Sequence, residues 1–282
     1  MIFDKRISLK PYEYPELMSF VDAINQTMWF HTKWSFKSDV DDFQTRLSTS
    51  EQNVIKKSLL AIAQIEVSVK TFWGKLYEHF PKPEINSVGV TFAESEVRHE
   101  RAYSMIIDLL KMNDEYNAIL DVPEIKGRVE YLQKYLSNAG SNVKEKYVLT
   151  LALFSLFIEN VSLFSQFFIV KSFNKHKKIL KDIDNVIMET AKEENIHAEL
   201  GAYLFSIIKN EYPELIDSEF NEKIIRACHK AYIAEMNIVR WILQDTDFGF
   251  INYDIVDNFI KDRFNKSLNM VGLPNEFNVT QD

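Results

Sequence analysis

Apolar residues recur at helical spacing along most of the chain, and the segments that carry this pattern are long. Apolar positions three and four apart turn one face of a helix toward a core, whereas strict alternation would indicate strands. The N-terminal arm over residues 4–34 is predicted to be irregular, apart from one helix over residues 15–28. The pattern predicts helices over residues 15–28, 48–79, 85–112, 123–137, 143–173, 178–209, 214–243 and 252–268.

The residues between these segments also favour long helices. Seven Gly and seven Pro are few for 282 residues, and Gly and Pro are the residues that most often interrupt a helix. Ser48 and Glu51 have the spacing of a capping box that opens a helix. Pro81 and Pro83 end that helix, because proline cannot donate a backbone hydrogen bond. No Ser/Gly-rich linker is present, so we expect one all-helical domain over residues 1–282.

The segment over residues 147–170 is long and apolar enough to span a bilayer. It also carries Glu159, Asn160 and Gln166, and ionisable groups at membrane depth are costly. The sequence offers no second such span, and its N-terminus lacks the apolar stretch of a signal peptide. We therefore expect a buried helix in a soluble protein with no membrane partner.

Charge and cysteine content narrow the function classes. The net charge is −8, with both signs interspersed, which argues against a nucleic-acid partner because such proteins present a basic face. The single cysteine, Cys228, excludes an intramolecular disulfide and a cysteine-rich zinc site. This cysteine usage fits a reducing compartment, so we expect a cytoplasmic protein.

Both halves of the chain repeat one arrangement of polar residues on apolar helices. In each half a lone glutamate precedes a helix with a Glu-x-x-His pair. The lone glutamates are Glu66 and Glu159, and the pairs are Glu96 with His99 and Glu194 with His197. Residues three apart lie on one face of a helix, so each pair can bind one ion. Four carboxylates and two imidazoles suit two cations about 3.5–4 Å apart, preferably Fe or Mn, as in ferritin-like dimetal bundles.

The order of the motifs carries this prediction, because a single Glu-x-x-His spacing is weak. A carboxylate inside LFSLFIENVSLF is costly to bury unless a charge offsets it, and a metal ion does so. The competing interpretations are a protonated core glutamate at Glu159, an ion pair of Glu66 with Lys70, and ordinary core or surface roles for both histidines.

Two residues follow the histidines by one helical turn. Tyr103 comes four residues after His99, so its ring is expected just beyond the metal site, although a packed core tyrosine has the same spacing. Gly201 comes four residues after His197. Because glycine lowers helix stability, we expect another backbone to approach closely at Gly201.

Together these motifs resemble the small (beta, radical-generating) subunit of class I ribonucleotide reductase over residues 34–274. FAESEVRHERAYSMII carries the first pair and Tyr103, at the position of the radical tyrosine. AKEENIHAELGAYLF and LFIENVSLF carry the second pair and its lone glutamate. KWSFKSDVDDF is similar to the segment with the relay tryptophan, here Trp34. Glu193 matches the acidic residue that connects a metal-bound histidine to that tryptophan.

The sequence departs from the family pattern in three places. Glu66 stands where many members have Asp, and Glu there occurs in subgroups that use manganese or a manganese–iron pair. The metal, and whether Tyr103 or the metal cluster holds the radical, stay open. Glu193 replaces an Asp of many members. The family's C-terminal tail has a relay tyrosine, whereas the last tyrosine here is Tyr253, so either the tail is not included in this sequence or the relay differs.

The resemblance implies a ferritin-like long-helix bundle with two Mn or Fe ions between four core helices. The ions would react with an oxygen species and store a one-electron oxidant. The oxidant would pass through His99, Glu193 and Trp34 to the large (alpha) subunit, which reduces ribonucleotides to deoxyribonucleotides. A homodimer is implied, and whether an activating flavoprotein takes part stays open.

Three other functions share part of this pattern. A ferritin-like dimetal oxidase acting on a small molecule would use the same ligands, but it needs no long-range relay through Trp34 and Glu193. A metal-storage protein generally has a shorter chain. A non-catalytic helical scaffold leaves the buried Glu159 without a purpose.

Overall fold

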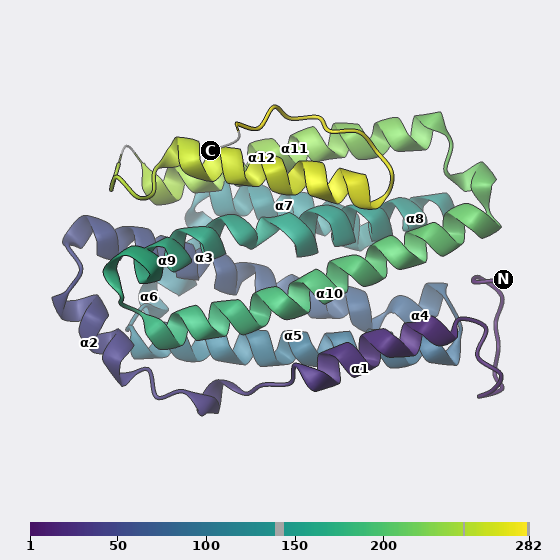
Figure 1. The fold of residues 1–282 in the computed structure, drawn as a ribbon, viewed down its shortest axis with the longest axis horizontal. Coiled ribbons are helices and arrows are strands. Elements are labelled where there is room, and N and C mark those ends of the chain that lie inside the picture. Colours follow the sequence, from purple (N-terminus) through teal and green to yellow (C-terminus); the bar gives the residue numbers. More distant parts are fainter. Residues whose placement is uncertain (139–143, 245, 281–282) are drawn as a thin grey trace.

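A computed structural model describes residues 1–138, 144–244 and 246–280. The regular elements among these residues are all helices, as the sequence predicts. The long helices run roughly along one axis, with α11 and α12 along one side and α1 along the opposite side (Figure 1). The chain is therefore built from helices packed on helices.

Four helical stretches form the centre of the bundle and match predicted segments. They are α3 (Thr49–Gly74), α5 (Pro83–Leu109), α10 (Lys181–Glu211), and the succession of α8 (Lys144–Leu153), the π-helical segment η4 (Phe154–Ser162) and α9 (Phe164–Lys177). α3 packs against α5, α10 packs against η4 and α8, and α5 also contacts α10. These contacts place the four predicted ligand-bearing segments side by side.

The other predicted helices surround this centre. They are α1 (Met18–Gln26) after the turn η1 (Pro15–Leu17), α7 (Pro123–Asn138), α11 (Ser218–Leu243) after η5 (Pro213–Leu215), and α12 (Tyr253–Met270). The helix expected to end near residue 79 is divided instead, with α4 (Leu76–His79) following α3. The remaining short elements are α2 (Lys37–Thr45), α6 (Asn113–Asn117), η2 (His31–Lys33) and η3 (Ile119–Asp121).

α2 was not predicted, because it is short and polar and depends on tertiary contacts. Its Asp39 carboxylate accepts the backbone N–H of Ile183 at 2.7 Å, and Asp42 accepts that of Leu180 at 3.1 Å. These bonds satisfy donors near the start of α10 that the helix leaves without partners. The predicted capping box at the start of α3 is confirmed: Ser48 and Glu51 exchange backbone-to-side-chain bonds of 3.4 and 2.8 Å.

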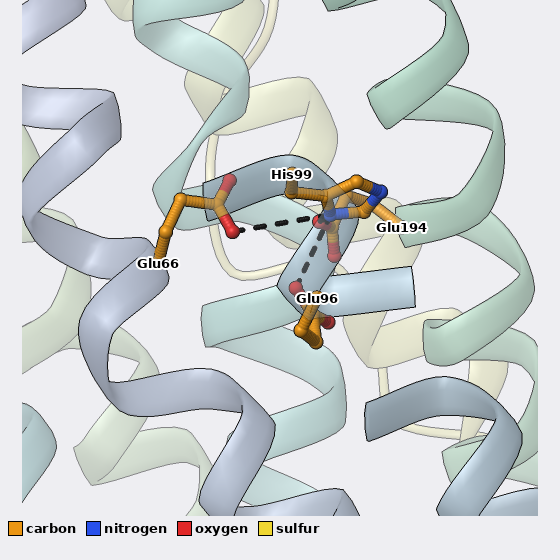
Figure 2. Close-up of side chains that lie close together, drawn as sticks. All are labelled: Glu66, Glu96, His99 and Glu194. Carbon is orange, nitrogen blue, oxygen red and sulfur yellow. Dashed lines mark hydrogen bonds and ion pairs between the residues drawn. The ribbon is translucent and has the colours of Figure 1, made fainter. Parts of the chain in front are cut away.

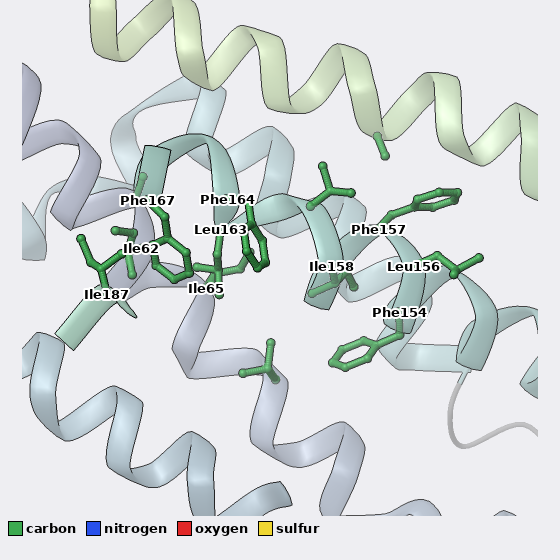
Figure 3. Packing of buried hydrophobic residues seen from close by; sticks show 14 of the residues in the cluster. Ile62, Ile65, Phe154, Leu156, Phe157, Ile158, Leu163, Phe164, Phe167 and Ile187 are labelled. Atoms are coloured by element: carbon green, nitrogen blue, oxygen red, sulfur yellow. The ribbon is translucent and has the colours of Figure 1, made fainter. Parts of the chain in front are cut away.

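The apolar segment in the second half is a core helix. Lys144–Lys177 is one stretch among the described residues that is long and apolar enough to cross a membrane, but it is almost entirely buried within the fold. Figure 3 shows Phe154, Phe157 and Ile158 of this segment in one apolar cluster with Ile62 and Ile65 of α3. The expected buried helix is confirmed.

A close contact at Gly201 brings η4 against α10. A Cβ atom on Gly201 would lie 1.8 Å from Oγ and 2.1 Å from Cβ of Ser155. The backbone approach expected from the sequence is therefore present, and it exists because glycine has no side chain. Ser155 lies four residues before Glu159 and Gly201 lies four residues after His197, so this contact fixes how deeply the two helices sit beside the polar cluster.

Candidate metal centre

Six polar side chains converge between the four central stretches, and each is at most 1% exposed. They are Glu66 of α3, Glu96 and His99 of α5, Glu159 of η4, and Glu194 and His197 of α10. These are the six residues singled out from the sequence. They form two groups of four, each with ligand atoms within 4.8 Å of one another, and Glu96 and Glu194 belong to both groups.

The two shared glutamates lie between the two histidines. Glu96 places Oε2 3.2 Å from Nδ1 of His99 and Oε1 2.9 Å from Nδ1 of His197. Glu194 places Oε1 3.1 Å from Nδ1 of His99 and Oε2 3.4 Å from Nδ1 of His197. Figure 2 shows Glu96 and Glu194 close to the His99 ring. Each of these carboxylates can therefore bridge two cations.

The lone glutamates complete one group each. Glu66 lies on the side of His99, with Oε2 3.9 Å from Nδ1 (Figure 2). Glu159 lies on the side of His197, with Oε2 3.4 Å from Nδ1. Each half of the cluster thus has one imidazole, one carboxylate of its own and two shared carboxylates, which is an arrangement suited to a pair of ions.

The cluster has more acceptors than the surrounding protein satisfies. Within the described part of the chain, both oxygens of Glu66 and both of Glu194 lack a hydrogen-bond donor although they are buried. Buried polar atoms without partners are costly, and four carboxylates together repel one another. Two divalent cations would satisfy these oxygens and offset their charge, so the residues present fit a dimetal site.

Burial and mutual repulsion dominate the protonation of the cluster. Burial raises the pKa of Glu66 well above its usual range, and the neighbouring charges of Glu96 and Glu194 add to this effect. Burial, together with the charge of Glu194, likewise raises the pKa of Glu159. Burial also opposes ionisation of Glu194, but the neighbouring side chains of Glu159, His197 and His99 outweigh it and lower the pKa of Glu194. Cations in this site would therefore replace protons.

Hydrogen bonds behind the two imidazoles turn their Nδ1 atoms toward the cluster. Ser95 donates its single hydroxyl hydrogen to the carbonyl of Phe92 at 2.7 Å, so its oxygen accepts Nε2–H of His197 at 3.0 Å. Glu193 accepts Nε2–H of His99 at 2.7 Å. Each ring can therefore offer its Nδ1 lone pair to a cation once Nδ1 has given up its proton, as a metal ligand requires. Nothing in the spacing of the motifs pointed to Ser95.

Trp73 holds one of the lone glutamates. Its indole Nε1–H donates to Oε1 of Glu159 at 2.8 Å, and the side chain is fully buried. Trp73 follows Glu66 by seven residues on α3, which is two helical turns on the same face. That spacing is the signal by which the sequence could have identified Trp73.

Tyr103 lies beside the cluster, as its spacing predicts. It is 1% exposed and its hydroxyl donates to Oγ1 of Thr190 at 3.2 Å. Burial raises the pKa of the Tyr103 phenol, and the nearby charge of Glu66 raises it further. The phenol is thus neutral and shielded from water, with Thr190 as its hydrogen-bond partner.

The tryptophan that contacts Glu193 is Trp29, whereas the resemblance noted from the sequence motifs pointed to Trp34. Nε1 of Trp29 donates to Oε2 of Glu193 at 3.1 Å, and the indole stacks on the His99 ring with centroids 5.9 Å apart. Trp34 lies one ring farther out, 5.7 Å from Trp29. The two tryptophans are five residues apart in the irregular arm, and periodicity cannot choose between them there because the contact depends on the path of a loop.

Four central helical stretches that surround two adjoining carboxylate–imidazole groups define a dimetal-carboxylate helical bundle. The chain belongs to the ribonucleotide reductase small-chain family: the model of the family described as "Ribonucleotide reductase, small chain" matches residues 6–282. The resemblance noted from the motifs is thereby confirmed.

Curated relatives carry the same description. The chain is 27% identical over 217 residues to the probable ribonucleoside-diphosphate reductase small subunit 048L of Invertebrate iridescent virus 3, covering 72% of this chain and 57% of the viral protein. It is 22% identical over 257 residues to the ribonucleoside-diphosphate reductase subunit beta of Chlamydia pneumoniae, covering 87% and 74%. The chain thus spans less than two thirds of the length of the viral relative.

Solved structures share the fold. A putative class I ribonucleotide reductase from Bacillus halodurans superposes with a TM-score of 0.86 at 19% identity, covering 92% of this chain and 93% of that one. Dimanganese(II)-NrdF from Streptococcus sanguinis superposes with a TM-score of 0.83 at 17% identity, covering 98% and 94%. These likenesses confirm the predicted ferritin-like, all-helical fold class.

Proposed function

We propose that this chain is the radical-generating beta subunit of a ribonucleoside-diphosphate reductase. The observation that carries the proposal is the buried cluster itself, in which two carboxylate–imidazole groups share Glu96 and Glu194 beside Tyr103. The names of the curated relatives, all small or beta subunits of that enzyme, support it. One helical domain over the whole chain is part of the proposal.

The proposed ligands are the six clustered residues, and the proposed cofactor is a pair of Mn or Fe ions. Carboxylate and imidazole ligands suit these metals better than sites rich in thiolate, and one structural neighbour is described as a dimanganese protein. When bound, the ions would supply one-electron oxidising power after reaction with O2 or a reduced oxygen species. Trp73, Ser95 and Glu193 orient the ligands from outside.

Tyr103 is the proposed side chain for storage of the oxidising equivalent. The hydroxyl of Tyr103 donates to Oγ1 of Thr190 at 3.2 Å, which holds the phenol in one orientation. Complete burial keeps water and external reductants away from the ring. Both features favour a long-lived tyrosyl radical.

We propose that an electron returns to the centre through Trp34, Trp29, Glu193 and His99. The contact of Trp29 with Glu193 and His99 supports the inner part of this route. Trp34 is partly exposed and lies in contact range of Trp29, which suits the outer part. This arrangement keeps Trp34 in the relay and assigns the contact with Glu193 to Trp29.

The proposed partner is a large subunit that binds and reduces the nucleotide. In the family this reduction uses several redox cysteines, whereas this chain has Cys228 alone, and Cys228 is fully buried. Burial raises the pKa of its thiol, which makes it a poor nucleophile. The proposal includes a homodimer of this chain in the cytoplasm.

The test combines this chain, loaded with Mn or Fe, with its cognate large subunit. We expect reduction of ribonucleoside diphosphates by the mixture and none by either chain alone. Reduction by this chain without the large subunit would contradict the two-chain proposal, and an inactive mixture containing metal-loaded chain would contradict the function.

A further inference from the structure

Arg98 of α5 is a buried arginine beside His99, and its guanidinium joins three groups. The side chain is 5% exposed. Nε donates to Glu94 one turn earlier at 2.9 Å, and Nη1 donates to Oε1 of Glu193 at 2.9 Å. Nη1 also lies 3.4 Å from the carbonyl oxygen of Trp29. One side chain therefore reaches both the carboxylate and the backbone of the proposed relay.

Arg98 donates to both oxygens of Glu193, and Oε2 also accepts from the two rings. Oε2 accepts from His99 at 2.7 Å and from Trp29 at 3.1 Å, while Arg98 lies nearest Oε1 at 2.9 Å and is 3.2 Å from Oε2. A carboxylate oxygen has two lone-pair positions, so Oε2 can serve both rings. The bond of Arg98 to Oε1 fixes the rotation of the carboxylate in which this is possible.

Arg98 also supplies the charge that makes this buried carboxylate tenable. Glu193 is 0% exposed, and an ionised carboxylate held only by two neutral ring N–H groups is costly to bury. A charge-assisted bond to a guanidinium is stronger than a neutral hydrogen bond. Arg98 thus offsets the charge of Glu193 with an ion pair of 2.9 Å.

We propose that Arg98 is a positioning residue of the relay, holding Glu193 so that one oxygen connects Trp29 with His99. The inference rests on the proposed relay function. Lysine cannot replace it fully, because a single ammonium on a flexible stem lacks the fork that reaches Glu94, Glu193 and the Trp29 carbonyl together. Substitution should therefore disturb the Trp29 contact while leaving the six clustered side chains in place.

NMR of the full metal-free chain, labelled with ¹⁵N in its tryptophan indoles, tests the inference without activity. The chain has four tryptophans, and Trp29→Phe assigns the Trp29 signal. We expect Arg98→Met to shift the Trp29 indole resonance and to speed its exchange with solvent about tenfold or more, the equivalent of one lost hydrogen bond. Arg98→Lys should give a smaller change, and it serves as the test variant if Arg98→Met does not fold.

Arg226→Met is the matched control. Arg226 pairs with Glu222 four residues earlier on α11, in the spacing of Arg98 with Glu94, but it is 58% exposed. This variant should leave the Trp29 signal unchanged. An unchanged Trp29 signal in both Arg98 variants would overturn the inference.

A second measurement separates this inference from the relay itself. Loaded with metal, Arg98→Met should keep the wild-type metal content. Its turnover with the large subunit should fall about tenfold or more, because one hydrogen bond to Glu193 is lost. Arg98→Lys should recover part of this turnover. Full turnover in Trp29→Phe would sink the proposed relay. A different result would separate the two proposals. If Trp29→Phe falls to background turnover while Arg98→Met keeps wild-type turnover and a wild-type NMR spectrum, the role of Arg98 is contradicted and the relay stands.

Discussion

The indole of Trp29 donates a 3.1 Å hydrogen bond to the carboxylate of Glu193, which in turn accepts Nε2–H of His99 at 2.7 Å. The bond joins the irregular N-terminal arm to α10 across 164 positions of sequence. It gives the buried cluster a continuous hydrogen-bonded connection toward the surface. A self-contained oxidase has no need of such a connection.

Replacement of Trp29 is therefore expected to separate radical storage from turnover. Trp29→Phe should lower nucleotide reduction with the large subunit to background, because phenylalanine neither donates to Glu193 nor is readily oxidised, while the metal content stays unchanged. Trp34→Phe should lower turnover as well. Trp241→Phe is the control, since Trp241 is a partly exposed residue of α11 whose ring packs against Lys57. Wild-type turnover in Trp29→Phe would contradict the relay.

The close contact between Gly201 and Ser155 predicts a large effect of a single methyl group. Gly201→Ala should destabilise the fold by about 1–3 kcal/mol, as overpacking does, because its Cβ would lie 1.8 Å from Oγ of Ser155. Urea unfolding measures the change. Gly127→Ala is the matched control: no atom lies within 4 Å of its Cβ position on α7, and it should stabilise by about 0.5–1 kcal/mol.

A rescue variant distinguishes this clash from a loss of helix propensity. Ser155→Gly removes the atoms that the new methyl group would meet. The double variant, Gly201→Ala with Ser155→Gly, should therefore be more stable than the sum of the two single changes predicts. Simple additivity of the two changes would mean that the contact does not limit the approach of η4 to α10.

Trp73 should matter for metal affinity although it is not itself a ligand. Trp73→Phe removes the 2.8 Å hydrogen bond to Glu159 and keeps most of the packing. Loss of such a bond behind a ligand typically costs 10- to 100-fold in affinity, so we expect a fall of about tenfold. Competition titration with a metal-binding dye measures it. An affinity equal to that of Trp241→Phe would show that Glu159 needs no support from Trp73.

Glu235 predicts a specific dependence of stability on pH. It is 2% exposed on α11, and burial raises its pKa to about 7, with the charge of Arg128 opposing the shift. The folded chain then binds a proton that the unfolded chain releases near its ordinary pKa of 4.5. This stabilisation is complete below that value and is lost as pH rises through about 7.

Glu235→Gln tests this dependence, because the amide stays neutral at every pH. Relative to wild type, its free energy of unfolding should rise by about 1–3 kcal/mol between pH 5.5 and pH 8.5. Glu222→Gln on the same helix is the control, since Glu222 is 67% exposed. A difference between Glu235→Gln and wild type that stays constant with pH would refute the shifted pKa.

The sequence predicted the long helices and the six clustered residues well, because both depend on local spacing. Helical periodicity places Glu96 with His99, and Glu194 with His197, on one face whatever surrounds them. The π-helical geometry of η4 was not predicted, since it depends on how Glu159 and Ser155 meet α10. Arg98 and Ser95 were also missed, because their roles arise from contacts between α5 and α10.

The choice between Trp29 and Trp34 shows the same limit. Both belong to one short segment without periodicity, and the path of η2 decides which indole reaches Glu193.

Metal analysis combined with electron paramagnetic resonance tests the central claim most directly. The chain, purified after expression with Mn or Fe and then exposed to its oxidant, should contain two ions per chain, one for each ligand group. It should also show a radical signal that Tyr103→Phe removes or alters. Glu159→Ala should lower the metal content. A wild-type chain that binds neither metal, with all six side chains intact, would contradict the account.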